Sequence, residues 1–342
     1  MTTTTTTEPT VVRIPSGADA CDARHWSGQG TDVATGSGAG SDAATGTGAG
    51  ADVVTGASGD ASATGSFAGP RGRPCVVMAH GLGATRDGGL DGFAERLAAE
   101  GLDVLAFDYR GFADSGGGPR QDVDPARQRE DYRSAIAHAR TIPGVDPDRI
   151  VVWGCSFAGG HVLRVAAEDP RVAAVVSLTP AGDGMAVMRK LLAEDGVGAA
   201  LRLTALGIRD LLAAIRGRDP VTAPLVARPG EVAAITAPGA LERYTALAGP
   251  SWRNVVAGRI FLRIGAYRPI RKAAAIDGAL LVQVADEDTV APPAAQTAAG
   301  VRGRAQVHHY PCDHFDVYPG QPWFDAIVEH QIAFLRRALA VA

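Results

Sequence analysis

From Arg73 to its C-terminal end, the sequence alternates short apolar stretches with longer amphipathic ones. The apolar stretches consist mostly of Val, Ala, Leu and Ile and are bounded by Gly, Pro or charged residues, which is typical of buried strands. The amphipathic stretches have helical spacing and begin or end at Gly, Asp or Pro, as helices commonly do. The predicted strands are 75–81, 102–111, 149–154, 171–180, 278–286 and 305–311, and the predicted helices are 89–101, 124–142, 156–169, 292–301 and 322–340. This alternation predicts an α/β fold with a mostly parallel sheet covered by helices on both faces.

The alternation is interrupted between residues 181 and 272. The stretch "AVMRKLLAEDGVGAALRLTALGIRDLLAAIRG" reads as helical, and loops marked by proline follow it. We therefore predict an inserted helical lid at 181–272, with the core of the fold formed by 70–180 and 273–342. The lid is rich in arginine. Its cations either belong to solvated helix faces or form a wall that attracts an anionic substrate.

Residues 27–69 contain almost no large apolar side chain. Three consecutive ten-residue units, "TDVATGSGAG", "SDAATGTGAG" and "ADVVTGASGD", consist mainly of Gly, Ala, Thr, Ser and Asp. Such a segment cannot bury enough apolar surface to offset its conformational entropy, so we expect a flexible insertion. A calcium-binding β-roll also repeats Gly and Asp, but its GGxGxD units are absent. In the N-terminal strand region 1–26, "TVVRIPSG" and "CDARHW" are expected to form a strand pair interrupted by this insertion.

Charge and composition argue against several classes of protein. The net charge is −4 and no dense basic tract occurs, so no nucleic-acid partner is expected. No apolar run reaches the roughly eighteen residues that a membrane span needs. The start "MTTTTTTEPTVVRIPSG" lacks the basic and apolar regions of a secretory signal. Cys21, Cys75, Cys155 and Cys312 are scattered, with no CxxC pair or metal-ligand spacing, so we expect no metal and a reducing cytoplasmic location.

The stretch "VVWGCSFAGGHVL" (151–163) reads as a strand, a turn of small residues and the start of a helix, with Ser156 in the turn. A turn at the carboxyl edge of a parallel sheet projects its side chain into the crevice where such folds bind ligands. The pattern is close to the G-x-S-x-G signature of a nucleophile elbow, with Ala158 at the last glycine position. Ser156 is therefore either a nucleophile or a helix cap. Cys155 is expected to point away from the crevice.

A serine hydroxyl needs a base to remove its proton. The stretch "HHYPCDHFDVY" offers histidines at 308, 309 and 314. His308 and His309 lie within a predicted strand, whereas His314 follows it in a loop at the carboxyl edge of the sheet. We therefore predict that His314 is the base. His161, inside the helix after Ser156, is predicted to be a packing residue.

The imidazole in turn needs a carboxylate that fixes its tautomer and stabilises its charged form. The predicted strand in "LLVQVADEDTVAPP" ends near Ala285 and is followed by acidic residues. Asp288 is our first choice for this acid, Asp286 the second, and Asp183, just after the fourth strand, the third. The chain order Ser156, Asp288, His314 is the order that this architecture uses.

The oxyanion of an acyl-transfer reaction needs backbone N–H donors. The amide of Phe157, directly after the serine, is one predicted donor. The other is the amide of Leu82, in the glycine-containing loop "HGLGATRDGG" that follows the first strand of the core. His80 is predicted to order this loop rather than to transfer protons.

The motifs "VVMAHGLGATRD", "FDYRGFADSGG", "GCSFAGGHVLRVAAEDPRV", "ADEDTVAPP" and "YPCDHFDVY" together resemble those of the α/β-hydrolases. More narrowly, they resemble bacterial lidded hydrolases of the dienelactone-hydrolase-like or serine-aminopeptidase-like groups. The resemblance covers the chain from about Cys75 onward. It implies an α/β-hydrolase fold, acyl transfer with no cofactor, and structural roles for Asp108 and Arg110. Two alanines, Ala113 and Ala158, stand where glycine is usual in these motifs.

The sequence thus predicts a serine hydrolase that cleaves a carboxylic ester of a small or medium acyl substrate. A thioesterase or acyltransferase is the nearest alternative, and the arginine-rich lid would suit a phosphate-bearing carrier. A peptidase is a further alternative. A non-catalytic binding protein with the same fold is the alternative of a different class, but it would not need Ser156, Asp288 and His314 together.

Overall fold

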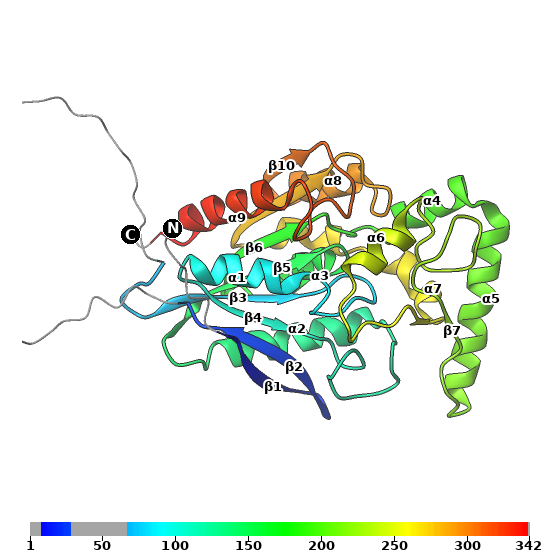
Figure 1. Cartoon of the computed structure of the whole chain (residues 1–342), viewed down its shortest axis with the longest axis horizontal. Helices are drawn as coiled ribbons and strands as arrows, with labels where there is room; N and C mark the ends of the chain where they lie inside the picture. Colours follow the sequence, from blue (N-terminus) through cyan, green and yellow to red (C-terminus); the bar gives the residue numbers. More distant parts are fainter. Residues whose placement is uncertain (1–7, 29–66, 341–342) are drawn as a thin grey trace, which may run out of the picture.

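The computed structural model describes residues 8–28 and 67–340, and these form one sheet with helices on both faces (Figure 1). The strand order is β1-β2-β4-β3-β5-β6-β9-β10. All neighbours from β4 to β10 are parallel, and the two pairs at the β1 edge are antiparallel. The predicted mostly parallel sheet is thereby confirmed. The strands are β1 (Thr10–Ser16), β2 (Asp19–Trp26), β3 (Arg73–Ala79), β4 (Asp103–Phe107), β5 (Val145–Cys155), β6 (Val172–Leu178), β9 (Ala279–Ala285) and β10 (Gln306–Tyr310).

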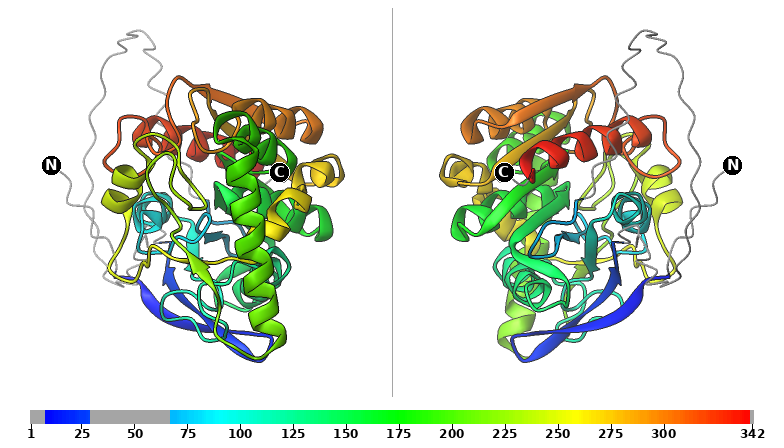
Figure 2. Two further views of the ribbon diagram at one scale, coloured as in Figure 1. Left: turned by 90° about the vertical axis from the view of Figure 1, so that its right-hand side faces the viewer. Right: turned by 90° about the vertical axis from the view of Figure 1, so that its left-hand side faces the viewer.

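Two groups of helices cover the sheet (Figures 1 and 2). Helices α1 (Leu90–Ala99) and α9 (Phe324–Ala338) pack together on one face. Helices α2 (Pro125–Ala139), α3 (Phe157–Glu168) and α8 (Pro293–Gly303) cover the other, together with the 3-10 segment η2 (Pro269–Ala275). Because helices cover both faces, the central strands β3 to β6 are almost entirely buried, which explains their continuous apolar sequences.

The N-terminal strands form a hairpin, and the prediction that the insertion interrupts this strand pair is wrong. The last residue of β1, Ser16, pairs with the first of β2, Asp19, so a tight turn joins them. Gly17 has a φ of +56° in this turn. The repeats predicted as a flexible insertion come later, between β2 and β3, and residues 29–66 lie outside the described part of the chain. The pattern of alternating side chains in 10–26 favoured two strands but carried no information on which turn connects them.

The segment between β6 and η2 lies beyond the carboxyl ends of the central strands (Figure 1). Its two long helices coincide with the stretch predicted to be helical. The segment contains α4 (Gly184–Glu194), α5 (Gly196–Ile215), β7 (Thr222–Ala223), α6 (Ala240–Leu247), β8 (Val256–Ala257), α7 (Ile260–Arg263) and η1 (Ile264–Ala266). In the left view of Figure 2, α5 stands in front of the other elements.

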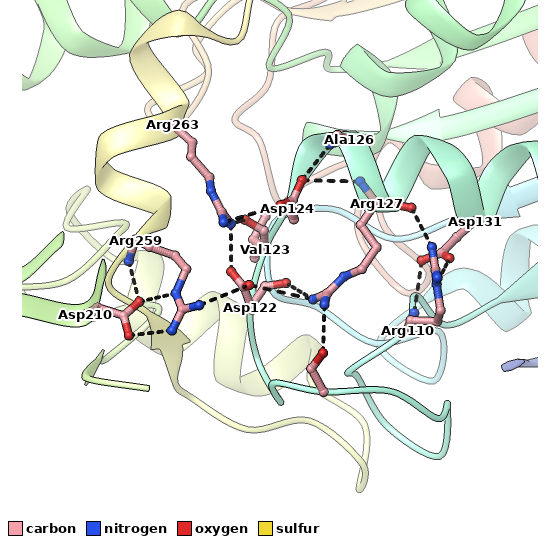
Figure 3. A network of polar contacts seen from close by, with 11 residues as sticks. Arg110, Asp122, Val123, Asp124, Ala126, Arg127, Asp131, Asp210, Arg259 and Arg263 are labelled. Carbon is pink, nitrogen blue, oxygen red and sulfur yellow. Dashed lines mark hydrogen bonds and ion pairs between the residues drawn. The ribbon is translucent and has the colours of Figure 1, made fainter. Parts of the chain in front are cut away.

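A network of buried and half-buried ion pairs fastens this segment to the core (Figure 3). Arg259 donates to both carboxylate oxygens of Asp210 on α5, at 2.6 and 2.8 Å. The same guanidinium lies 3.8 Å from Asp122 in the core, which also accepts a 2.8 Å hydrogen bond from Arg263. Arg263 pairs in addition with Asp124, the N-cap of α2. Arg259 and Arg263 of the predicted lid thus hold it in place.

Candidate active site

Ser156 occupies the turn between β5 and α3 with φ = 58° and ψ = −118°, a conformation that a side-chain-bearing residue seldom adopts. Its side chain does not cap α3. The turn needs very small neighbours: a Cβ added to Gly154 would lie 2.4 Å from the backbone of Ala158. Ala158 itself lies inside α3 and has no positive φ, so its methyl group brings no backbone strain. Ser156 is therefore held at the carboxyl edge of the sheet with its hydroxyl directed away from the helix.

His314 lies in the loop after β10 and contacts both Ser156 and Asp288. Its Nε2 atom is 3.1 Å from Ser156 Oγ, and its Nδ1 atom is 2.7 Å from Asp288 Oδ2. All three residues are buried. The three predicted catalytic residues are thus brought together from three separate strand ends, in a chain of hydrogen bonds that can move a proton from Ser156 to His314.

Asp288 is fixed by further hydrogen bonds. Its Oδ1 accepts from the amides of Val290 and Ala291 at 2.8 and 2.6 Å, and its Oδ2 accepts from Gln296 Nε2 at 2.7 Å. Gln296 is fully buried and donates also to the Ala291 carbonyl. Gln296 was not singled out from the sequence, where it appears as one long amide in the small-residue helix "PPAAQTAAG". These contacts orient the carboxylate toward His314.

The two alternative acids lie elsewhere. Asp286 is half exposed and contacts His309 Nδ1 at 2.6 Å. Asp183 is the N-cap of α4 and forms a bidentate pair with Arg268. Neither has a contact with His314 among those that the described residues form. The geometry therefore favours Asp288 as the partner of the imidazole.

The charge of Asp288 controls the protonation of His314. Burial alone would lower the pKa of the imidazole, because it removes water from the charged form. The charge and hydrogen bond of Asp288 outweigh this effect and raise the pKa of His314 above its ordinary value. The site thus stabilises the imidazolium that forms when His314 takes a proton.

The two predicted oxyanion donors are the amides of Phe157, which directly follows Ser156, and of Leu82, in the loop that follows β3. Neither donates to an acceptor within the described residues, so both are free to bind an oxyanion. The loop that carries Leu82 runs close to the serine, since a Cβ added to Gly81 would lie 3.0 Å from Ser156 Cβ. From the inserted segment, the Tyr244 hydroxyl donates to the Leu82 carbonyl at 2.8 Å. No local pattern of the sequence marks Tyr244, because it lies on a helix of the insertion, 162 residues from Leu82.

Three other titratable side chains near Ser156 are unsuited to its chemistry. Burial raises the pKa of Cys155 to about 11, and its sulfur faces Tyr318 and not His314. His161 contacts Tyr267 and Gln128 inside the core, and burial holds its pKa well below the ordinary value.

The third such side chain is His80, which lies beneath the loop of Leu82. Its Nε2 atom is 3.4 Å from a carboxylate oxygen of Asp108, which accepts a hydrogen bond from the Arg86 amide. Burial lowers the pKa of His80 to about 4 and raises that of Asp108 to about 7. His80 is therefore neutral at pH 7, and the hydrogen bond from the Arg86 amide to Asp108 joins the two loops.

The space above Ser156 is a narrow pocket with a mostly hydrocarbon wall. Trp252 stacks on Tyr244, and Phe315 packs against His314. The apolar and aromatic residues that line the pocket are Leu82, Ala84, Leu90, Ile235, Tyr244, Leu247, Ala248, Trp252, Phe315 and Tyr318. Such a wall excludes water from the serine and suits an uncharged group next to it.

Within residues 8–28 and 67–340, no cluster of His, Cys, Asp and Glu could hold a metal ion. No helix in the same part of the chain is long and apolar enough to cross a membrane.

Comparison with known proteins gives matches over most of the chain. A family model described as the alpha/beta hydrolase fold matches residues 74–317. The quorum-quenching protein AidA of Acinetobacter baumannii is 43% identical over 271 residues, which cover 78% of this chain and 88% of AidA. The thiohydrolase aneE of Aspergillus aculeatus is 32% identical over 164 residues, 48% of this chain and 51% of aneE. The crystal structure of the α/β hydrolase GrgF from a Penicillium species has the same fold, with a TM-score of 0.73 and 19% identity over 98% of this chain and 100% of GrgF.

Proposed function

This chain belongs to the α/β-hydrolase family, and on that premise we propose that it is a serine hydrolase that cleaves carboxylic esters through an acyl-enzyme. The family model and the relatives named a quorum-quenching protein and a thiohydrolase together support an enzyme that acts on ester or thioester bonds. In the proposal Ser156 is the nucleophile, His314 the general base and Asp288 the acid that orients His314. The amides of Leu82 and Phe157 form the oxyanion hole.

Each step of the proposed reaction uses these groups. Ser156 Oγ attacks the carbonyl carbon while its proton passes to His314 Nε2, and the two amides bind the oxyanion. His314 then gives this proton to the leaving oxygen as the acyl-enzyme forms. A water molecule next loses a proton to His314 and attacks the acyl carbon, which releases the acid and restores the Ser156 hydroxyl.

One observation carries the proposal: buried His314 contacts Ser156 at 3.1 Å and Asp288 at 2.7 Å. A protein that only binds ligands has no use for a strained serine whose hydroxyl faces a carboxylate-paired imidazole. This contact therefore supports an enzyme against the binding-protein alternative.

Labelling with a fluorophosphonate probe tests the proposal, because this probe reacts with activated serines. The wild type should be labelled, and Ser156→Ala and His314→Ala should not. Asp286→Asn is the matched control for Asp288→Asn, since only the latter removes the partner of His314. Equal labelling of Ser156→Ala and wild type would assign the nucleophile to another serine, and an unlabelled, folded wild type would favour a binding protein.

A thioesterase or acyltransferase is the second candidate, because a relative is named a thiohydrolase. The same residues would then act on a thioester, and an acyltransferase would use another nucleophile in place of water. A panel of matched esters and thioesters with one acyl group separates the candidates by their kcat/KM values. No contact of the site favours a peptide amine, so a peptidase has less support.

We also propose the domain roles predicted from the sequence for the described residues: 181–272 is a lid over a core of 70–180 and 273–342. Of the predicted insertion 27–69, residues 29–66 lie outside the described part of the chain, and Phe67 is buried in the core. The contact of Tyr244 with Leu82 supports the lid, because it joins the insertion to the proposed oxyanion loop. We propose a cytoplasmic location on the ground that all four cysteines are buried, unpaired thiols.

A further inference from the structure

We propose that the acyl part of the substrate is an aliphatic chain and that it binds in a second cavity beneath the insertion, here called the lid cavity. Its walls include Val187 and Leu191 of α4, Ala200 and Leu203 of α5, Phe261 of α7, and Leu82. This inference rests on the proposed function, since it assigns a substrate class to the same serine.

The lid cavity adjoins the pocket of Ser156. Leu82 lines both spaces, and the adjacent residues Ala234 and Ile235 line one each. The Leu82 amide is the proposed oxyanion donor, so the carbonyl of a bound ester lies beside Leu82. A chain that extends from this carbonyl across Leu82 enters the lid cavity.

The chemistry of the lid cavity suits hydrocarbon. Among the described residues that line it, only Thr204 has a polar side chain, and its hydroxyl already donates to the Ala200 carbonyl at 2.8 Å. A polar acyl group would lose its hydrogen bonds with water there and gain none. Each methylene buried in such a cavity strengthens binding by about fourfold.

A neighbouring groove suits the other half of the substrate. It shares Val187, Leu191 and Ala234 with the lid cavity, but it also carries Lys190, Glu194 and Asp195. Because charged side chains line it, this groove favours a polar leaving group over hydrocarbon.

Ala200→Phe tests the lid cavity because the new ring would occupy it. The matched control is Ala193→Phe, at an exposed position of α4. With a series of nitrophenyl esters from acetate to dodecanoate, wild-type kcat/KM should rise with chain length. Ala200→Phe should lower kcat/KM for the longest esters by about tenfold or more relative to its effect on acetate, whereas Ala193→Phe should change the kcat/KM of neither. An equal loss for every chain length would overturn the assignment.

A second readout does not depend on catalysis. Ser156→Ala should bind a fluorescent polyene fatty acid, and adding Ala200→Phe should abolish this binding. If the wild type hydrolyses esters at rates that do not depend on chain length, and the fatty acid does not bind, the lid cavity is not the acyl site. The proposed function would still hold. If the fatty acid binds but the wild type hydrolyses no ester or thioester, the proposed function is wrong and the lid cavity is still supported as a site for hydrocarbon.

A separate observation concerns the outer face of α5. Six large apolar residues of this helix have exposed fractions between 42% and 74%: Val197, Leu201, Ile208, Leu211, Leu212 and Ile215. Five of them, with Thr204 in the third place, follow one another at alternating steps of four and three, which is the spacing of a coiled-coil seam: 197, 201, 204, 208, 211 and 215. Large apolar surfaces of this kind are usually covered by a partner.

We infer that this seam pairs with the same seam of a second copy of the chain, in antiparallel orientation. Asp195 is the N-cap of α5, and Arg216 and Arg218 follow the C-terminal end of the helix, whereas Glu194 ends α4 and pairs with Lys190. An antiparallel two-fold pair brings Asp195 of each copy to the arginines of the other, whereas a parallel pair would place arginine against arginine.

Sedimentation velocity of the full chain tests this pairing. The wild type should be a dimer at micromolar concentration, and Leu201→Glu should be a monomer of unchanged helicity. Val301→Glu, at a position 71% exposed on α8, is the matched control and should stay dimeric. Arg216→Glu should weaken the dimer, and adding Asp195→Arg should restore it. A monomeric wild type would overturn the inference, as would a seam that binds anionic lipid vesicles in place of a second copy.

Discussion

At the turn that carries Ser156, the absence of a methyl group from Gly154 decides whether the turn can form. A Cβ at this position would lie 2.4 Å from both the carbonyl carbon and the carbonyl oxygen of Ala158, which are backbone atoms and cannot move aside easily. We predict that Gly154→Ala lowers the free energy of unfolding by about 1–3 kcal/mol and moves Ser156 away from His314. Thermal unfolding and fluorophosphonate labelling measure the two effects.

Gly198→Ala provides the comparison, because Gly198 lies in α5 and its nearest neighbour would be 3.8 Å from an added Cβ. There the change should stabilise the protein by up to about 1 kcal/mol through helix propensity. Equal stability of Gly154→Ala and wild type would contradict the close contact at the turn.

The protonation of His314 gives a prediction about pH. His314 must be neutral to accept the proton of Ser156, so activity is lost as the pH falls through its pKa. Because Asp288 raises this pKa, kcat/KM should decline below a pH that is higher than about 6.5, the ordinary histidine value. In Asp288→Asn the burial of His314 is no longer opposed by a negative charge, so the pKa of His314 falls and the decline of kcat/KM should move to lower pH. The value of kcat/KM at the plateau should fall by about 10³–10⁴.

The measurement is kcat/KM between about pH 5 and 9. Asp286→Asn should leave the profile unchanged, since Asp286 contacts His309 at the surface. A profile that Asp288→Asn does not shift would show that another group sets the pKa of the base.

At the residue level, the sequence indicated which side chains follow strand ends, and the structure brings Ser156, His314 and Asp288 together. Their catalytic roles remain predictions. Strand ends converge in a parallel sheet, so this part needs only the order of elements. The sequence already ranked Asp288 above Asp286, and the distances favour the same order. Gln296 and Tyr244 act through contacts that no local pattern encodes.

At the level of elements, the attachment of α5 to the rest of the insertion depends on one buried carboxylate. Asp210 accepts from the Arg259 side chain, the Arg259 amide and the Val221 amide. Burial alone would raise its pKa, but these hydrogen bonds prevail and hold the pKa below the ordinary value. The stabilisation is therefore present at neutral pH and is lost as the pH falls through this lowered pKa.

We predict that Asp210→Asn destabilises the insertion by about 3 kcal/mol, because it leaves buried Arg259 with Asp122, 3.8 Å away, as its remaining charge partner. Hydrogen exchange should become faster in 196–263 while β3 and β5 keep their protection. Asp148→Asn, which removes only surface pairs with Arg71 and Arg171, should change little. Uniform acceleration over the whole sheet would mean that the insertion and the core unfold as one unit.

The predicted elements of the core match the structure to within a few residues, because each buried strand and amphipathic helix has a local signal. The predicted strand 102–111 ends already at Phe107, where the chain turns into the loop of Asp108 and Arg110. In the insertion, helices were predicted but not their packing. Arg259 and Asp210 are 49 residues apart, and no periodicity predicts that they meet.

At the scale of the whole molecule, the segment 29–66 connects β2 to β3 at the end of the sheet away from Ser156. Phe67, which follows it, is buried and packs against Arg336, and its carbonyl accepts from Arg149. Residues from Phe67 onward thus belong to the core, and a variant that shortens the segment 29–66 should keep them. The composition of the repeats predicts a connection that contributes no burial.

Replacing 29–66 by a linker of about eight Gly and Ser residues shortens this connection by slightly more than two halvings. Each halving of the loop length lowers the entropic cost of closing the loop on folding. The free energy of unfolding of the variant should therefore be about 1 kcal/mol higher than that of the wild type. Its kcat/KM for esters should equal that of the wild type, because the repeats enter far from Ser156. Chemical denaturation and steady-state kinetics on the two proteins decide the matter. A large loss of folded protein would show that the repeats form structure that the core requires.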